Sequence, residues 1–357
     1  VLDVDGTYLR TDLLLESFWA GMGRDPVSTL GALRHWRDRP RLKAELARIG
    51  QPDLSLMPRD PEVAALARAA RSEGRAVVLA SAADADLVAA LGRADPTVTD
   101  TLGSTPGRNL KGAEKARALV DRYGRSGFDY AGDSHADAAV WAEARRAIVV
   151  GGPARQVAQL RGAGQDVTEI PGGWTWRAAR RALRPHQYVK NVLLFLPVIA
   201  AHAFQWQPFA LVLLGIVAFS AAASSIYVVN DLLDLAADRQ HATKCNRPLA
   251  SGALPIGVGM ALGLGAGALA LILGALLGPA FLAVICVYIV LSLAYSLKLK
   301  RMRWIDVFCL AALYTLRVVA GAAASGVEAT LSMLVFIFPV FLTLGCVKRL
   351  TELAKAT

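Results

Sequence analysis

The sequence predicts two domains, an α/β domain followed by an all-α bundle of transmembrane helices. Its 357 residues are enough for about two domains. Charge is uneven, because residues 1–183 hold 26 Lys+Arg and 23 Asp+Glu whereas residues 184–357 hold 13 and 6. Long apolar runs fill the second half, and a chain that is 54% hydrophobic is not an ordinary soluble enzyme.

The first domain is expected over residues 1–170, where polar residues follow strand-like apolar runs. The opening VLDVDG has the pattern of the end of a buried strand, so we expect the chain to begin inside a longer one. Open α/β sheets bind ligands at the carboxyl ends of their strands. Three segments fit this pattern: Asp3 to Thr7, Val77 to Ser81, and Phe128 to Ala131 running into Gly132 to Asp137.

These segments carry the groups that phosphoryl transfer requires. Asp3 and Asp5 lie two residues apart and share one face of a strand, so both can approach one phosphate. Asp3 is the candidate nucleophile and Asp5 the candidate acid/base. Carboxylates also suit Mg²⁺. The candidate metal ligands are Asp3, Asp5, Asp133 and Asp137, and the candidate phosphate ligands are Thr7, Ser81 and Lys111, with Lys115 as the alternative lysine.

The motifs DVDGT, the strand ending in Ser81, the NLKG lysine and GDSHAD resemble, in order, the four motifs of haloacid-dehalogenase-type (HAD) phosphatases. The resemblance covers nearly all of residues 1–155. It implies a Rossmann-like α/β fold and Mg²⁺, and residues 13–70, with their helical pattern, would be the substrate-selecting cap. A domain kept only as a scaffold is the alternative, although no motif acid is missing.

The second half holds six candidate membrane spans, because about 20 apolar residues cross a bilayer. They are residues 191–206, 208–229, 255–277, 279–297, 304–325 and 331–347. The first contains Pro197 and is expected to be kinked or partly re-entrant. Basic residues cluster in alternate loops, which predicts that these loops and the first domain are cytoplasmic. Residues 171–190 are expected to be an interfacial linker, with a solvated linker helix as the alternative, and residues 191–357 the transmembrane domain.

Three aspartates at the end of the second span have helical spacing. At about 100° per residue, Asp231, Asp234 and Asp238 fall on one helix face. Acids at a membrane edge are costly and indicate function, here Mg²⁺ held between carboxylates and a diphosphate. Lys244 and Arg247 follow closely and suit phosphate oxygens.

The stretch from Asn230 to Asp238 resembles the NDxxDxxxD signature of the UbiA superfamily of intramembrane prenyltransferases. The resemblance implies nine helices, of which six are present, so the domain would be incomplete at its C-terminal end. It also implies metal ligands at Asn230, Asp231, Asp234 and Asp238. The second loop, residues 295–306, departs from the aspartate-rich pattern of the aromatic prenyltransferases, because it has one acid and four cations.

The basic loop favours substrates with extra phosphates. Several segments are most similar to the decaprenyl-phosphate phosphoribosyltransferase branch: Arg184 to Asn191, NDLLDLAADR, Tyr295 to Lys298, Asp306 with Arg317, and Val347 to Arg349. Arg317 lies well inside its span, where a cation requires a polar partner. The resemblance implies phosphate ligands at Lys190, Tyr295, Lys298 and Arg317, and Asp306 as a metal ligand or a ribose-orienting group.

The resemblances together predict a bifunctional membrane enzyme. One half would transfer 5-phosphoribosyl from phosphoribosyl diphosphate (PRPP) to polyprenyl (decaprenyl) phosphate, and the HAD half would remove the 5-phosphate, with Mg²⁺ in both. The partners would be these substrates and the lipid bilayer of a bacterial inner membrane, with no nucleic acid, and homo-oligomerisation stays open. The alternatives are an aromatic prenyltransferase with an accessory phosphatase, a phosphatase on a non-catalytic anchor, and a transporter.

Overall fold

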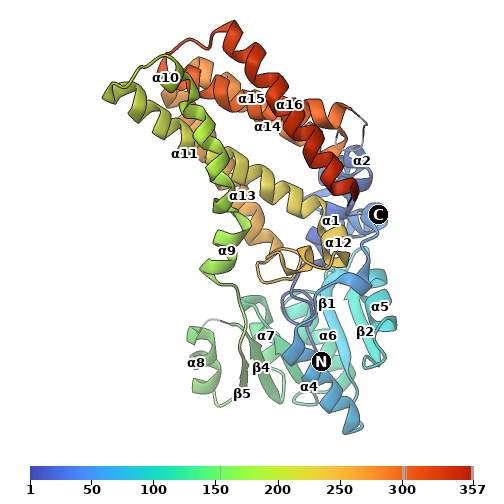
Figure 1. Cartoon of the computed structure of the whole chain (residues 1–357). Helices are drawn as coiled ribbons and strands as arrows, with labels where there is room; N and C mark the ends of the chain where they lie inside the picture. Colours follow the sequence, from blue (N-terminus) through green and yellow to red (C-terminus); the bar gives the residue numbers. More distant parts are fainter. Residues whose placement is uncertain (153, 300–301, 303, 355–357) are drawn as a thin grey trace. The chain divides into compact units, whose positions relative to one another are not determined.

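The computed structural model describes residues 1–152, 154–299, 302 and 304–354, and these form two compact units. The first unit combines Val1–Ala179 with Asp231–Gly259, and the second combines Arg180–Asn230 with Met260–Thr357 (Figure 1). The loop with the three aspartates therefore belongs with the N-terminal domain. This differs from the expected single boundary near residues 171–190. Lys300, Arg301 and Arg303 of the basic loop, and the side chain of Lys348, lie outside the described residues.

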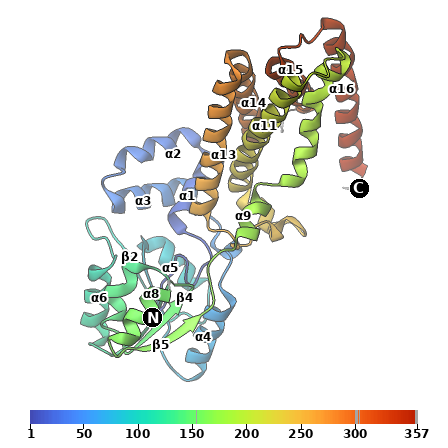
Figure 2. The same cartoon turned by 90° about the vertical axis from the view of Figure 1, so that its left-hand side faces the viewer.

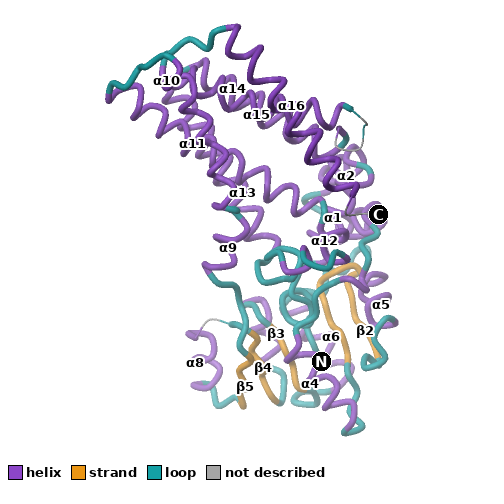
Figure 3. Tube along the Cα trace, in the orientation of Figure 1, coloured by secondary structure: helices purple, strands orange, loops and turns teal. Residues whose placement is uncertain are grey.

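The first unit is built on a parallel sheet, seen as the orange strands in Figure 3. Its strands are β1 (Val78–Asp84), β2 (Asp100–Ser104), β3 (Asp129–Gly132), β4 (Arg146–Val150) and β5 (Asp166–Ile170). β2 pairs with β1, and β3, β4 and β5 pair in that order. The opening residues join the two parts: Leu2 N donates to Val78 O and Asp3 N donates to Ala131 O, both at 2.8 Å. Asp3 and Asp5 therefore emerge from the middle of the sheet.

Alternating side chains of the strands enter two separate cores. Leu79, Ala131 and Ile148 pack on one face, whereas their neighbours Ala80 and Tyr130 pack on the other. This two-residue period is the one expected of a sheet covered on both faces. The first core also takes in side chains of α4 (Pro61–Ser72) and α5 (Ala85–Arg93), and the second takes in those of α6 (Ala113–Tyr123), α7 (Ala138–Trp141) and α8 (Ala154–Gly162).

Three helices that follow the DVDGT segment form a smaller group with its own apolar contacts. They are α1 (Leu13–Arg24), α2 (Pro26–Ala32) and α3 (Arg39–Gly50). Ala32, Leu42 and Leu46 are buried among them. The insertion is shorter than the expected residues 13–70, because Val63 and Ala67 of α4 are buried in the core of the sheet.

Short helices complete the first unit. The 3₁₀ turns are η1 (Leu33–His35), η2 (Leu54–Leu56), η3 (His135–Asp137) and η5 (Lys244–Asn246). The remaining α-helices are α9 (Trp176–Ala182), whose last residues belong to the second unit, and α12 (Leu235–Gln240).

Five helices are long and apolar enough to cross a membrane within the described part of the chain. They are α11 (Trp206–Leu233), α13 (Ile256–Leu277), α14 (Pro279–Leu297), α15 (Ile305–Ser325) and α16 (Leu331–Ala354). The first expected span, residues 191–206, is not one continuous membrane-length helix. Residues 191–206 contain the end of the 3₁₀ segment η4 (Pro185–Phe195) and the short α10 (Leu196–Ala200). Pro197 lies in the first turn of α10, where its missing N–H costs least.

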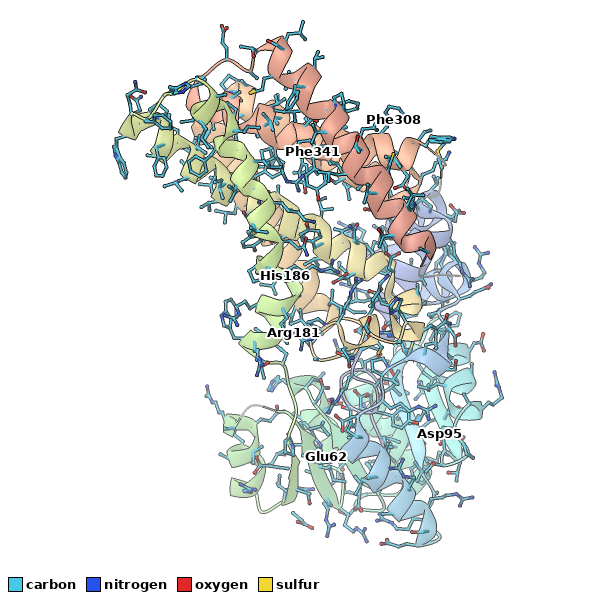
Figure 4. All side chains as sticks on the ribbon, in the orientation of Figure 1. Glu62, Asp95, Arg181, His186, Phe308 and Phe341 are labelled. Atoms are coloured by element: carbon cyan, nitrogen blue, oxygen red, sulfur yellow. The ribbon has the colours of Figure 1, made fainter. Side chains whose placement is uncertain are left out.

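Small and aromatic side chains hold the bundle of the second unit together, and Figure 2 shows its long helices running side by side. Ala218, Ala222 and Ala320 are fully buried, and small residues allow helix backbones in membranes to approach closely. Phe219 of α11 contacts Tyr288 of α14 with ring centroids 4.3 Å apart. In Figure 4, α16 carries Phe341, whose ring stacks on Tyr314 of α15 at 5.1 Å.

Candidate functional sites

Three carboxylates meet where the opening segment and β3 end. The oxygens of Asp3, Asp133 and Asp137 lie within 4.8 Å of one another. Gly6, with φ +78°, makes this possible, because a Cβ there would come within 2.3 Å of an Asp133 oxygen. Hard oxygen ligands in this number suit Mg²⁺. Three of the four acids predicted as metal ligands in the first domain are therefore brought together, and Asp5 is not part of this group.

Lys115 is the lysine of this cluster. It lies in the first turns of α6, and its Nζ donates to Asp3 Oδ1 at 2.6 Å and to Tyr130 Oη at 2.9 Å. Asp137 Oδ1 is 3.5 Å from the same nitrogen and accepts a hydrogen bond from Tyr130. The side chain of Lys115 is only 5% exposed. Lys111 is exposed, so the residue preferred from the sequence is not the one that pairs with Asp3.

Burial raises the pKa of two acids of this cluster, Asp3 and Asp133, and of Asp5 beside it. The pKa of Asp3 rises to about 6 through burial, although the charge of Lys115 opposes the shift. Burial and the charges of Asp12 and Asp3 raise the pKa of Asp5 to about 8. Burial and the charges of Asp3 and Asp137 raise the pKa of Asp133 to about 7. An excess of buried acids with one cation favours either protons or an added divalent cation.

Asp5 lies beside the cluster and is held by two donors. Its Oδ1 accepts a hydrogen bond from Leu13 N at 2.7 Å, and its Oδ2 accepts one from Ser81 Oγ at 3.0 Å. The hydroxyl of Thr7 is buried with no hydrogen-bond partner among the described residues. A protonated Asp5 can donate a proton, and an unpartnered hydroxyl can bind a phosphate oxygen.

Lys43 of α3 was missed from the sequence. Its Nζ donates to Ala82 O and also to Asn109 Oδ1, at 3.3 Å. Burial lowers its pKa, while the charges of Asp5 and Asp12 raise it. Nothing local distinguishes Lys43 from the other basic residues of the insertion, so only the three-dimensional packing of α3 identifies it.

The loop aspartates do not lie on one continuous helix. α11 ends at Leu233 and α12 begins at Leu235, so Asp234 occupies the break. Asp231 and Asp238 are nevertheless each 2% exposed and share one guanidinium. Arg247 Nη1 donates to Asp231 Oδ1 at 3.1 Å and to Asp238 Oδ2 at 2.6 Å. The expected helix is interrupted at Asp234, and Asp231 and Asp238 face a common cation.

The donor set of this loop fits a divalent cation in composition. Its three aspartates carry three negative formal charges against the one positive charge of Arg247. The side-chain oxygen of Asn230 is buried without a hydrogen-bond partner in the described part of the chain. Among described residues the three aspartates do not form a group within 4.8 Å of one another, and Arg247 pairs with both Asp231 and Asp238. Lys244, which lies between Asp238 and Arg247 in the sequence, is exposed.

A buried arginine marks the interior of the second unit. Arg317 is 5% exposed; its Nε donates to Asn191 Oδ1 at 3.1 Å and its Nη1 to Leu313 O at 2.6 Å. Its guanidinium carbon lies 5.2–5.5 Å from the ring centroids of three aromatic residues, Phe219, Tyr288 and Tyr314. The sequence predicts that Arg317 needs a polar partner, and in the structure this partner is Asn191. Cation–π contacts with the three rings add to the stabilisation. Lys190 Nζ lies 6.0 Å from the Tyr314 ring.

Asp306 has different partners from Arg317. It is 4% exposed and accepts hydrogen bonds from Tyr295 Oη at 2.8 Å, and it pairs with Arg349 Nη2 at 2.5 Å. The arrangement leaves Asp306 with one hydroxyl and one cation, which suits a positioning group. Lys298, at the end of α14, is exposed.

The family model matches the second half of the chain, whereas one relative matches the whole chain. The family model described as "UbiA prenyltransferase family" matches residues 191–353. The uncharacterized protein y4nM of Sinorhizobium fredii is 34% identical over 367 residues, with 100% of this chain and 70% of that protein covered. A decaprenyl-phosphate phosphoribosyltransferase of Corynebacterium glutamicum is 41% identical over 153 residues, covering 42% of this chain and 46% of the relative.

One solved structure is similar to this chain, with a lower sequence identity than these relatives. The structure of a UbiA homolog from Archaeoglobus fulgidus bound to GPP and Mg²⁺ gives a TM-score of 0.41 at 23% identity, covering 46% of this chain and 59% of that one. The five apolar helices and the family match together indicate an integral membrane protein. The chain belongs to the UbiA prenyltransferase family through residues 191–353.

Proposed function

We propose that the membrane domain transfers 5-phosphoribosyl from PRPP to a polyprenyl phosphate, and that the N-terminal domain then hydrolyses the 5-phosphate. The observation that carries the first part is the relative named decaprenyl-phosphate phosphoribosyltransferase, 41% identical to this chain over 153 residues. The chain covers only 46% of that protein, so the activity is a proposal for this chain. The bacterial inner membrane, with the acidic loop on its cytoplasmic side, is part of the same proposal.

The transfer step exchanges one phosphate ester for another. A phosphate oxygen of the lipid attacks C1 of the ribose, the C1–O bond to diphosphate breaks, and diphosphate leaves with the electron pair. Asn230, Asp231, Asp234 and Asp238 would hold Mg²⁺, which when bound offsets the diphosphate charge. Arg247 exchanges its contacts with the two buried carboxylates for phosphate oxygens.

Other residues would bind the charged ends of the two substrates. Lys244 is exposed at the loop and suits the diphosphate. In the second unit, we assign Lys190, Tyr295, Lys298 and Arg317 to phosphate groups. Asp306, held by Tyr295 and Arg349, would orient the ribose or take part in metal binding.

The hydrolytic step would use Asp3 and Asp5. A carboxylate oxygen of Asp3 attacks phosphorus, the bond to the sugar oxygen breaks, and Asp5 donates its proton to that oxygen. Water then attacks the acyl phosphate and releases inorganic phosphate and the Asp3 carboxylate. The pKa of Asp5, about 8, keeps it protonated at neutral pH, as a general acid requires. Asp3, Asp133 and Asp137 would hold Mg²⁺, and Thr7, Ser81 and Lys115 would bind the phosphate.

The test follows radiolabel from PRPP into lipid. Membranes carrying the full chain are incubated with Mg²⁺, ribose-labelled PRPP and polyprenyl phosphate, and the extracted lipids are separated by their phosphate content. Labelled lipid without the 5-phosphate is expected. No labelled lipid, together with prenyl transfer from a prenyl diphosphate to an aromatic acid in a parallel reaction, would instead show an aromatic prenyltransferase.

Variants separate the two steps. Asp3→Asn should stop dephosphorylation and leave the phosphorylated lipid to accumulate, whereas Asp121→Asn, an exposed change on α6, should behave as wild type. Asp231→Asn should stop transfer but preserve hydrolysis of phosphorylated lipid supplied from outside. Transfer that survives in Asp231→Asn would contradict the role of Asp231. No transfer by the wild type, together with hydrolysis of the supplied phosphorylated lipid, would support a phosphatase on a non-catalytic anchor.

A further inference from the structure

Within the first unit, one cavity is lined by two segments that are distant in sequence. It measures about 620 Å³. Asp133 of the carboxylate cluster, with Asp5 and Gly6 beside it, lines one part of the cavity. Residues that follow the aspartate loop line another part: Gly252, Ala253 and Pro255 to Val258. The cluster that would bind a phosphate therefore shares a cavity with residues outside the N-terminal domain's own sequence.

Segment 252–258 is fixed to the N-terminal domain by close packing. Gly252 has φ +72°, and a Cβ there would lie 2.5 Å from Arg10 Cβ and 2.6 Å from Arg10 O. Only glycine allows the backbone to approach Arg10 so closely. The segment therefore has a defined position beside Asp5 and Asp133.

A buried ion pair strengthens this attachment. Arg239 Nη2 donates to Glu16 Oε1 at 2.5 Å and Arg239 Nη1 donates to Glu16 Oε2 at 3.1 Å. Both side chains are at most 7% exposed. Arg239 Nε donates to Ala250 O at 3.0 Å, and Thr11, which lines the cavity, donates to Glu16 at 2.5 Å. Such a bidentate pair fixes geometry as well as adding energy.

The cavity has a polar part and an apolar part. Besides the carboxylates, it is lined by Leu15, Pro255, Ile256 and Val258. Ile256 is the first residue of α13, a helix apolar enough to cross a membrane. A ligand whose phosphate lies at Asp5 and Asp133 therefore extends along the first turn of an apolar helix.

We propose that segment 252–258 determines the specificity of the N-terminal site, selecting phosphomonoesters carried on a membrane lipid over soluble ones. The proposal rests on the hydrolytic part of the proposed function and names its substrate class. The carboxylates recognise the phosphate common to both classes, so discrimination comes from the wall that segment 252–258 provides.

Two substitutions narrow this wall without entering a packed core. Ala253 is exposed and lines the cavity, so Ala253→Trp should fill part of it. At Gly257 a Cβ would meet only Leu15 Cδ1, at 3.8 Å, so Gly257→Leu should also be accommodated. Gly265 lies on the same helix with no atom within 4 Å of a built Cβ, and Gly265→Leu is the matched control.

The full chain in detergent micelles is assayed with lipid-linked ribose 5-phosphate and with free ribose 5-phosphate, comparing kcat/KM for the two. In Ala253→Trp and Gly257→Leu the ratio of lipid-linked to free substrate should fall about tenfold or more, a size typical of changed pocket contacts. Gly265→Leu should keep the wild-type ratio. Melting temperatures identify a variant that fails to fold. If one of the two variants does not fold, the substrate ratio of the other one tests the proposal.

An unchanged ratio in both variants, with wild-type hydrolysis of both substrates, would overturn the role of segment 252–258 and leave the phosphatase assignment standing. If the wild type hydrolyses free ribose 5-phosphate but not the lipid-linked substrate, the proposed specificity is overturned as well. Hydrolysis of neither substrate by the wild type would overturn the proposed phosphatase itself, and this inference with it.

Discussion

Replacing Lys115 with methionine tests which lysine serves the carboxylate cluster. Methionine has a similar length but no charge, so Lys115→Met removes the cation 2.6 Å from Asp3 and 3.5 Å from Asp137. Removing one partner of a buried ion pair costs about 3–5 kcal/mol. Protonation of Asp3 offsets part of this cost, because its pKa is already about 6 with the lysine present.

At pH 7, one unit above the pKa of Asp3, protonating this carboxylate costs only about 1.4 kcal/mol. The free energy of unfolding should therefore fall by about 2 kcal/mol, less than the full cost of an unpaired charge. At about 2–4 °C per kcal/mol, the melting temperature in detergent should fall by about 4–8 °C. For the proposed phosphatase activity, kcat/KM should fall about a hundredfold or more, as when one preorganised donor is removed from a charged site.

Lys111→Met is the matched control, because Lys111 is exposed and four residues away. Surface substitutions usually change stability by less than about 0.5 kcal/mol, so its melting temperature should be close to wild type. A greater loss of activity in Lys111→Met than in Lys115→Met would refute the assignment of Lys115. An unchanged melting temperature and activity in Lys115→Met would refute it as well.

Three further predictions concern acid stability, the buried arginine and helix packing. Burial raises the pKa of Asp129, but hydrogen bonds from two arginines outweigh burial and lower it to about 2. The stabilisation by ionised Asp129 is thus present above about pH 4 and lost as the pH falls to about 2. In Asp129→Asn the melting temperature should change less with pH between these values, and the free energy of unfolding at pH 7 should fall by about 1 kcal/mol. Arg317→Lys keeps the charge but loses the planar guanidinium, and labelled-lipid formation should fall about tenfold or more; equal rates would contradict its phosphate role. Gly321→Ala should lower the melting temperature by the equivalent of about 1–3 kcal/mol, because its Cβ would lie 1.9 Å from Leu194 O, whereas Gly265→Ala should lower it not at all.

The sheet and its acids could be predicted because their signals are local. The apolar runs before Asp3, Ser81 and Asp133 indicate strands, and parallel strands bring their carboxyl ends to one edge. The choice between two lysines depended on where α6 begins. Because the helix starts at Ala113, Lys115 shares its inward face with the buried Leu119, four residues on, while Lys111 precedes the helix.

The acidic loop shows where local periodicity is insufficient. The 100° spacing assumes one uninterrupted helix, but the helix breaks at Asp234. Asp231 and Asp238 are brought together by Arg247 instead, through a turn that the spacing does not reveal. Likewise, the partner of Arg317 is Asn191, 126 residues earlier, and no pattern within α15 indicates it.

The ion pair between Glu16 and Arg239, 223 residues apart, changes how the helical insertion is interpreted. From the sequence, residues 13–70 are expected to be the cap that selects the substrate. In the structure, Glu16 in the first turn of α1 pairs with Arg239, and Arg239 donates to the carbonyl oxygen of Ala250, two residues before the segment that lines the cavity. The desolvated carboxylate of Glu16 would be unfavourable without this cation. The insertion therefore contributes to the cavity in two ways, through its own residues and by anchoring a loop of the family domain beside the carboxylates.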